Sequence, residues 1–323
     1  MEPKHKDSIR PDFFYSIVAG VLYGIVAQLS ARLGLFNDVY VVMSFCYVFI
    51  LPVCLGFIAV DRSTPQQKSS VTEWIMKPSL VVITCMMFSF IVGWEGSICI
   101  AMALPIYLPM AILGGVIAGL LHKHRHRTKL ILLIPICAGP LEAHYVDLPQ
   151  EVRSVYTSLE LQATPHEVWP EIIRVRPITE NQQGFFYKMG FPKPLEATLS
   201  FEGVGGVREA KFERGLTFYE TITEWDDKRK IRFKIEAHPD TVPLTTLDPH
   251  VVPGGAFFDA LEGTYEIKPH PKLSDRVTLH LSSQYRLSTH FNFYASWWGD
   301  WLMEDIQNNI LNVIQQRVQQ RVQ

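Results

Sequence analysis

Residues 207–225, VREAKFERGLTFYETITEW, predict a β-hairpin whose pairing depends on the length of its loop. Apolar and polar residues alternate along both halves, which gives each strand one mostly apolar face. If Glu213–Gly215 is a three-residue loop, Gly215 takes the left-handed conformation that such loops often need, and Arg208 lies opposite Glu220. A two-residue loop would mix apolar with polar residues, because a slip by one residue exchanges the faces of a strand. We therefore expect the three-residue loop, with one charged pair on an apolar face.

Composition changes along the 323 residues, because apolar residues concentrate before about residue 145 and charged residues after it. All 5 cysteines lie in the apolar half, where buried small side chains are favoured over a disulfide framework. The net charge of −2 and the lack of basic runs interleaved with aromatic residues give no reason to expect a nucleic-acid partner. No pattern predicts a cofactor or an oligomeric state.

Four long apolar runs in the first half, 13–29, 39–60, 74–93 and 98–121, predict transmembrane helices. About 20 such residues cross a hydrocarbon core of ~30 Å, so we expect four helices within a membrane region that covers residues 12–145. A fifth, shorter run, 130–141, reaches a spanning length only if the stretch to residue 145 is included.

Basic residues lie in the tail 1–11, between the second and third runs, and in the segment 122–129, whereas the opposite loops offer only Arg32. Cytoplasmic loops carry an excess of Lys and Arg, so we expect a multi-pass membrane protein with a cytoplasmic N-terminus. If the fifth run spans, the rest of the chain is extracytoplasmic; if it is re-entrant or interfacial, the rest is cytoplasmic. Its position directly behind the basic segment favours spanning.

Glu95, in the sequence GWEGSIC, lies near the end of the third run and is a candidate functional residue of the membrane region. The alternative is a carboxylate that is hydrated at the interface or caps the next helix. His122, His124 and His126 alternate with Lys and Arg, and these positive charges oppose a divalent cation. We therefore predict a basic interfacial cluster there and no metal site.

The second half begins with an alternating strand, 152–163, followed by a helix start in which Thr164, Pro165 and Glu167 form a capping box. Two short helices follow. Alternation then predicts six more strands, and a long amphipathic helix with an aromatic N-terminal part closes the chain over 290–317. The strands are 195–202, 207–213, 216–225, 230–237, 256–268 and 277–287.

This order of elements, with the Thr164-Pro165-x-Glu167-Val168-Trp169 start, resembles the helix-grip superfamily, called SRPBCC, of START lipid-transfer domains, polyketide cyclases and birch-pollen-allergen-like proteins. The resemblance implies an α+β domain over 146–323, with a seven-stranded antiparallel sheet around a long C-terminal helix. The whole chain also resembles bacterial membrane proteins that place a multi-helix region before a cyclase-like domain, which implies the bacterial inner membrane. The residues that carry this second likeness are Glu95-Gly96-Ser97-Ile98-Cys99, Ala103-Leu104-Pro105, Gly203-x-Gly205-Gly206-x-Arg208, Gly215, Glu220 and Trp225.

In such a domain the inward faces of the sheet line a cavity, and apolar cavities with a few polar groups bind small hydrophobic molecules. The alternative is that the same residues fill the core. Arg208 is expected to anchor a ligand carboxylate or phosphate while Glu220 orients its guanidinium; otherwise the pair only fixes the register. The candidate ligand-binding residues are Arg208, Glu220, Phe201, Phe212, Phe218, Phe233, Tyr265, Tyr285, Trp298 and Trp301.

Three functions remain open, and the first is favoured: a membrane-anchored module that binds or transfers a lipid or another hydrophobic small molecule. The second is a cyclase- or dehydrase-like enzyme that uses Glu220, Tyr265, Tyr285 or His290 as acid or base. The third is a non-catalytic structural or partner-binding membrane protein. Catalysis has little support, because no catalytic triad order, metal-ligand spacing or nucleotide fingerprint is present. The long loop 238–255 is a candidate lid.

Overall fold

The structure, a computed structural model, describes residues 11–32, 38–64, 70–121, 132–238 and 252–322. The chain divides into two compact units, residues 1–147 and 148–323. The basic residues of the tail, the predicted basic cluster 122–129 and most of the predicted lid 238–255 lie outside the described residues.

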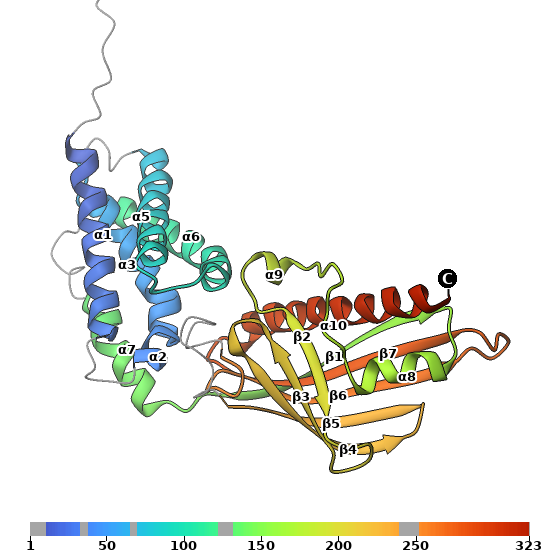
Figure 1. The fold of residues 1–323 in the computed structure, drawn as a ribbon. Coiled ribbons are helices and arrows are strands. Elements are labelled where there is room, and N and C mark those ends of the chain that lie inside the picture. Colours follow the sequence, from blue (N-terminus) through green and yellow to red (C-terminus); the bar gives the residue numbers. More distant parts are fainter. Residues whose placement is uncertain (1–10, 33–37, 65–69, 122–131, 239–251, 323) are drawn as a thin grey trace, which may run out of the picture. The chain divides into compact units, whose positions relative to one another are not determined.

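The N-terminal unit is helical (Figure 1). Its close packing depends on glycines: a Cβ on Gly56 would lie 1.8 Å from the Ala111 carbonyl oxygen, and one on Gly114 would lie 2.0 Å from that of Val53. Small residues of this kind let helix backbones approach each other directly. The helices are α1 (Pro11–Arg32), α2 (Asp38–Val42), a π-helical turn (Cys46–Ile50), α3 (Leu51–Asp61), α5 (Val71–Ile91), α6 (Ser97–Leu120) and α7 (Ile134–Tyr145).

Among the described residues, 3 helices (α1, α5 and α6) are long and apolar enough to cross a membrane. The prediction of one continuous helix over 39–60 is wrong, because the helix is interrupted between the end of α2 at Val42 and the start of the π-helical turn at Cys46. At this break the Glu142 carboxylate accepts a hydrogen bond from the Cys46 backbone N–H at 3.0 Å, and Ser44 Oγ accepts one from Tyr47 N–H at 3.2 Å. These side chains satisfy the backbone donors of a new helix start.

The predicted fifth membrane segment forms α7, which has 12 residues. A helix of that length measures ~18 Å, which is less than the ~30 Å thickness of a hydrocarbon core. Glu142, which accepts the hydrogen bond from the Cys46 backbone N–H at the interruption between α2 and the π-helical turn, belongs to α7. The helix is thus an integral part of the N-terminal unit.

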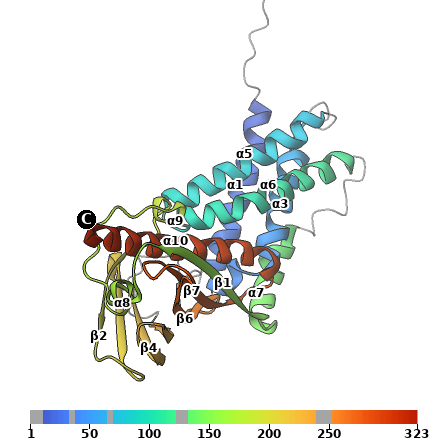
Figure 2. The ribbon, with the colours of Figure 1, turned by 90° about the vertical axis from the view of Figure 1, so that its right-hand side faces the viewer.

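The C-terminal unit is a seven-stranded antiparallel sheet with the order β1-β7-β6-β5-β4-β3-β2. The long helix α10 (Asn292–Val322) runs along one face of this sheet, as Figures 1 and 2 show. This arrangement confirms the predicted helix-grip fold. The strands are β1 (Gln150–Leu161), β2 (Pro194–Leu199), β3 (Val207–Phe212), β4 (Thr217–Asp226), β5 (Lys230–Ala237), β6 (Phe258–Pro269) and β7 (Val277–Ser288), and the short helices are α8 (Pro165–Ile173) and α9 (Phe185–Lys188).

The hairpin of β3 and β4 has the predicted register, with Arg208 opposite Glu220 and Ala210 opposite Phe218. Its loop is Glu213–Gly215, and Gly215 has the expected positive φ of 81°. The predicted start of α8 is also confirmed. Glu167 Oε2 accepts a hydrogen bond from the Thr164 backbone N–H at 2.7 Å and closes the capping box.

Three shifts of register help the sheet to curve around α10. They lie between Pro194 and Glu196, between Ile222 and Glu224, and between Ala260 and Glu262. Such irregularities bend a strand and increase its local twist. At the end of the sheet near α8, buried apolar side chains pack between the sheet and the helices, and the Trp169 and Trp225 rings meet edge to face at 5.1 Å.

Candidate functional site

A cavity of about 130 Å³ lies between the sheet and the middle of α10. Most of its walls are apolar, and α10 contributes Leu302, Ile306 and Ile310. An apolar cavity of about 150 Å³ engineered into another protein holds a benzene molecule, so this one has room for a small apolar group. The predicted ligand-binding residues that line it are Arg208, Phe212, Phe218, Glu220, Phe233 and Tyr265.

Arg208 and Glu220 form an ion pair on the concave face of the sheet. They point the same way because they lie opposite each other on β3 and β4. Their side chains are only 6% and 10% exposed, so the pair has little contact with water. Burial raises the pKa of the Glu220 carboxyl, and the Arg208 guanidinium opposes that rise.

Two aromatic residues complete the surroundings of this pair. The Arg208 guanidinium lies over the Phe233 ring, 5.7 Å from its centroid, a geometry in which the ring face attracts a cation. Burial raises the pKa of Tyr265 to about 12, while the neighbouring Arg208 guanidinium lowers it. Tyr265 therefore keeps its proton at neutral pH and can act as a hydrogen-bond donor. The result is one polar cluster in a mostly apolar cavity.

A second polar group, centred on Gln307 of α10, was not predicted from the sequence. Gln307 is buried, and its amide nitrogen donates to Ser283 Oγ at 2.9 Å and to the Val155 carbonyl oxygen at 3.3 Å. Its amide oxygen accepts a hydrogen bond from Thr157 Oγ1 at 2.9 Å. Gln307 and Ser283 both line the cavity. The sequence signal for this group was a glutamine on the apolar stripe of the helix, four residues after Met303.

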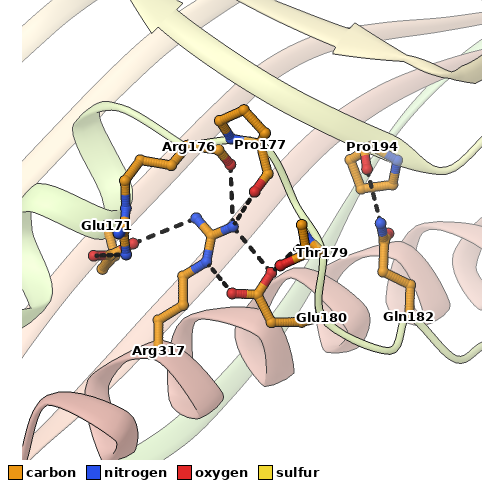
Figure 3. A network of polar contacts seen from close by, with 8 residues as sticks. All are labelled: Glu171, Arg176, Pro177, Thr179, Glu180, Gln182, Pro194 and Arg317. Carbon is orange, nitrogen blue, oxygen red and sulfur yellow. Dashed lines mark hydrogen bonds and ion pairs between the residues drawn. The ribbon is translucent and has the colours of Figure 1, made fainter.

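Arg317, also on α10, holds the segment between α8 and α9 at the edge of the cavity (Figure 3). Its Nε donates to Glu180 at 2.6 Å, and its Nη2 donates to the carbonyl oxygens of Arg176 and Pro177 at 3.0 and 3.2 Å. Its Nη1 lies 3.4 Å from the buried carboxylate of Glu171. One guanidinium thus satisfies two carboxylates and a turn of backbone.

We expect this contact to make the C-terminal unit sensitive to acid. The hydrogen bond from Arg317 lowers the pKa of the Glu180 carboxyl, so ionised Glu180 stabilises the folded unit above the ordinary Glu pKa of about 4.3. That stabilisation is lost as the pH falls through the lowered pKa. At pH 7 the C-terminal unit of the unchanged protein should therefore have a larger free energy of unfolding than that of the Glu180→Gln variant. The difference between the two should shrink towards pH 3. A difference that does not change with pH would contradict this.

Two predicted ligand-binding residues, Phe201 and Tyr285, lie outside the described cavity lining. The strand before Phe201 has already ended, and Tyr285 is covered by α10. Phe201 follows β2, beyond its last residue Leu199, and the residue is 53% exposed. Tyr285 faces inward but lies directly beneath α10, where its hydroxyl group donates to Asp300 at 2.6 Å. A Cβ on Gly299 would lie 2.8 Å from the Tyr285 ring. No space for a ligand remains between them.

Trp298 and Trp301 also lie outside the described lining, because the aromatic part of α10 faces α9 instead of the sheet. Trp301 stacks on Phe185 at 4.5 Å and meets Phe186 at 5.1 Å. Trp298 packs beside Trp301 at 5.6 Å. The residues of α10 that do face the cavity begin with Leu302, the residue after Trp301.

Glu95, the functional candidate of the N-terminal unit, forms an ion pair with Arg32 at 3.0 Å. Arg32 also donates to the Trp94 carbonyl oxygen at 2.9 Å and lies over the Trp94 ring. This pairing favours a carboxylate that joins two helix ends. Over the described ranges, no three His, Cys, Asp or Glu side chains gather closely enough to hold a metal ion.

The sequence matches no protein-family model and no curated protein. Similar solved structures include the Zhui aromatase/cyclase from Streptomyces, with 14% identity, a TM-score of 0.35, and coverage of 54% of this chain and 97% of that chain. A norcoclaurine synthase point mutant from Thalictrum, in complex with a transition-state analogue, has 11% identity, a TM-score of 0.33 and coverage of 55% and 99%. XoxI from Bacillus cereus has 17% identity, a TM-score of 0.33 and coverage of 53% and 98%.

All three identities lie below 25% and all three TM-scores below 0.5. The predicted order of elements is seen in this chain itself, with a seven-stranded antiparallel sheet before a long helix and apolar helices before the sheet. The activities named for those proteins belong to them.

Proposed function

We propose that this protein is a membrane-anchored module that binds a lipid or another hydrophobic small molecule in the cavity of its C-terminal unit. The cavity itself is the observation that carries the proposal, since a solid core would have favoured a purely structural domain. Concave, mostly apolar sites with a few convergent polar groups are typical of small-molecule binding. Here those polar groups are Arg208, Glu220, Tyr265 and Gln307.

The anchor in this proposal is the N-terminal unit, with α1, α5 and α6 as membrane-spanning helices. The distribution of basic residues supports a cytoplasmic N-terminus. The shortness of α7 supports the alternative in which this segment does not span, and in which the C-terminal unit is cytoplasmic. The membrane supplies a local pool of hydrophobic molecules beside the binding unit.

Filling the cavity should abolish uptake of a hydrophobic probe. Ala197 is buried on β2 and lines the cavity, whereas Thr198, the next residue, is exposed on the opposite face. In Ala197→Phe the added ring occupies the cavity, so we expect the affinity for 1-aminonaphthalene to fall by about tenfold or more. The measurement is the fluorescence rise of this neutral dye on addition of full-length protein in nanodiscs, with protein-free nanodiscs as background.

Thr198→Phe is the matched control, because it adds the same ring to the outer face of the same strand. It should leave dye binding close to that of the unchanged protein. Native mass spectrometry of the full chain, released from detergent, should also show a co-purified hydrophobic molecule that Ala197→Phe lacks. Failure of the unchanged protein to take up the dye or retain any molecule would refute the proposed function.

A further inference from the structure

We infer that the ligand presents a neutral oxygen acceptor, such as a carbonyl or hydroxyl oxygen, to the Arg208 guanidinium, and carries no net charge at that position. This inference rests on the proposed function and narrows it. The sequence alone left a carboxylate or phosphate as the group that Arg208 would anchor. The surroundings of the guanidinium now argue against an anion.

The charges that line the cavity are already matched. Arg208 pairs with Glu220, and Arg317 pairs with Glu180 and Glu171. The third glutamate of the described lining, Glu196, pairs with Lys211 at 3.1 Å, so each charged side chain of this lining has a partner of opposite charge. An anionic group would leave water for a mostly apolar space without a cation to receive it, and an unpaired buried charge is very costly. The same guanidinium repels a cation.

One hydrogen-bond donor of Arg208 indicates which ligand group suits this part of the cavity. Its Nε–H is buried and has no hydrogen-bond partner among the described residues. The residue as a whole is 5% exposed and lines the cavity. A buried donor without an acceptor costs about 1–3 kcal/mol, so a ligand oxygen that accepts this hydrogen bond gains affinity. Tyr265, protonated beside it, can supply a second donor to the same oxygen.

The test compares three naphthalene derivatives of nearly equal shape, and the unsubstituted parent, on the full-length protein in nanodiscs at pH 8. They are 2-naphthamide, 2-naphthoate, the cationic 2-naphthamidine and naphthalene itself. Each displaces bound 1-aminonaphthalene, and each affinity is corrected for partition into protein-free nanodiscs. We expect the amide to bind at least about tenfold more tightly than the carboxylate or the amidine. Naphthalene, which has no acceptor, should bind more weakly than the amide.

The double variant Arg208→Met/Glu220→Leu removes the donor and the charge together. In this variant the amide should lose its advantage over naphthalene, while naphthalene still binds. Binding of the carboxylate or the amidine as tightly as the amide would overturn the inference and leave the proposed function intact. An amide no better than naphthalene in the unchanged protein would overturn it as well. If none of the four compounds displaces the dye, the proposed function itself is contradicted.

Discussion

Glu220→Leu should destabilise the C-terminal unit by about 3–5 kcal/mol, the usual cost of breaking a buried ion pair from one side. The variant leaves the Arg208 guanidinium charged, because arginine does not lose its proton in proteins. The guanidinium would then lie 5% exposed in a mostly apolar cavity without its carboxylate. Hydrogen exchange of β3 and β4 peptides in the full-length, detergent-solubilised protein should show the loss, because it reports this unit separately from the helical one.

The double variant Arg208→Met/Glu220→Leu separates the cost of an orphaned charge from the value of the pair. Apolar residues of similar volume often replace a buried ion pair without loss, or with a gain of 1–4 kcal/mol. We therefore expect the double variant to recover most of the protection lost in Glu220→Leu. If the double variant is as unstable as the single one, the ion pair contributes net stability. The idea that the pair is retained for ligand recognition then loses its support.

Arg317→Met should have the second largest effect, about 3 kcal/mol, on the same grounds. Loss of this guanidinium removes the 3.4 Å ion pair to Glu171, whose side chain is 1% exposed. It also leaves the carbonyl oxygens of Arg176 and Pro177 without the donor that joins them to α10. We expect faster hydrogen exchange first in the peptide that connects α8 to α9.

Asn312→Met is the control for this change, because Asn312 is an exposed residue of the same helix. It should leave exchange of the α8–α9 connection unchanged. If Arg317→Met instead raises exchange equally across the whole unit, with no excess in that connection, Arg317 supports the core in general and does not hold this segment in particular.

The sequence predicts best the features that depend on neighbouring residues. The register of β3 and β4 follows from Gly215 and from the alternation on both sides of it. The start of α8 follows from Thr164 and Glu167, which lie three residues apart. In both cases the interacting groups are brought together by a single turn of chain, so local spacing contains the necessary information.

Features that depend on contacts between distant elements were missed. Apolar runs show no break at residues 43–45, because the group that satisfies the new helix start is Glu142, almost a hundred residues later. Trp298 and Trp301 at the start of α10 were expected to line the cavity. Trp301 packs instead against Phe185 and Phe186 of α9, and Trp298 against Phe186. Helix α9 has 4 residues, too few to be placed from sequence periodicity.

The first strand of the sheet pairs with the last, so that Gln150 lies opposite Ser288 and Leu161 lies opposite Val277. During translation β1 leaves the ribosome long before β7 exists, whereas β2 to β5 can pair as successive hairpins. Because α10 follows all the strands, the apolar face of the sheet stays uncovered until the helix has been synthesised. A ribosome stalled before residue 277 would therefore present an unpaired strand and an open sheet to chaperones and proteases.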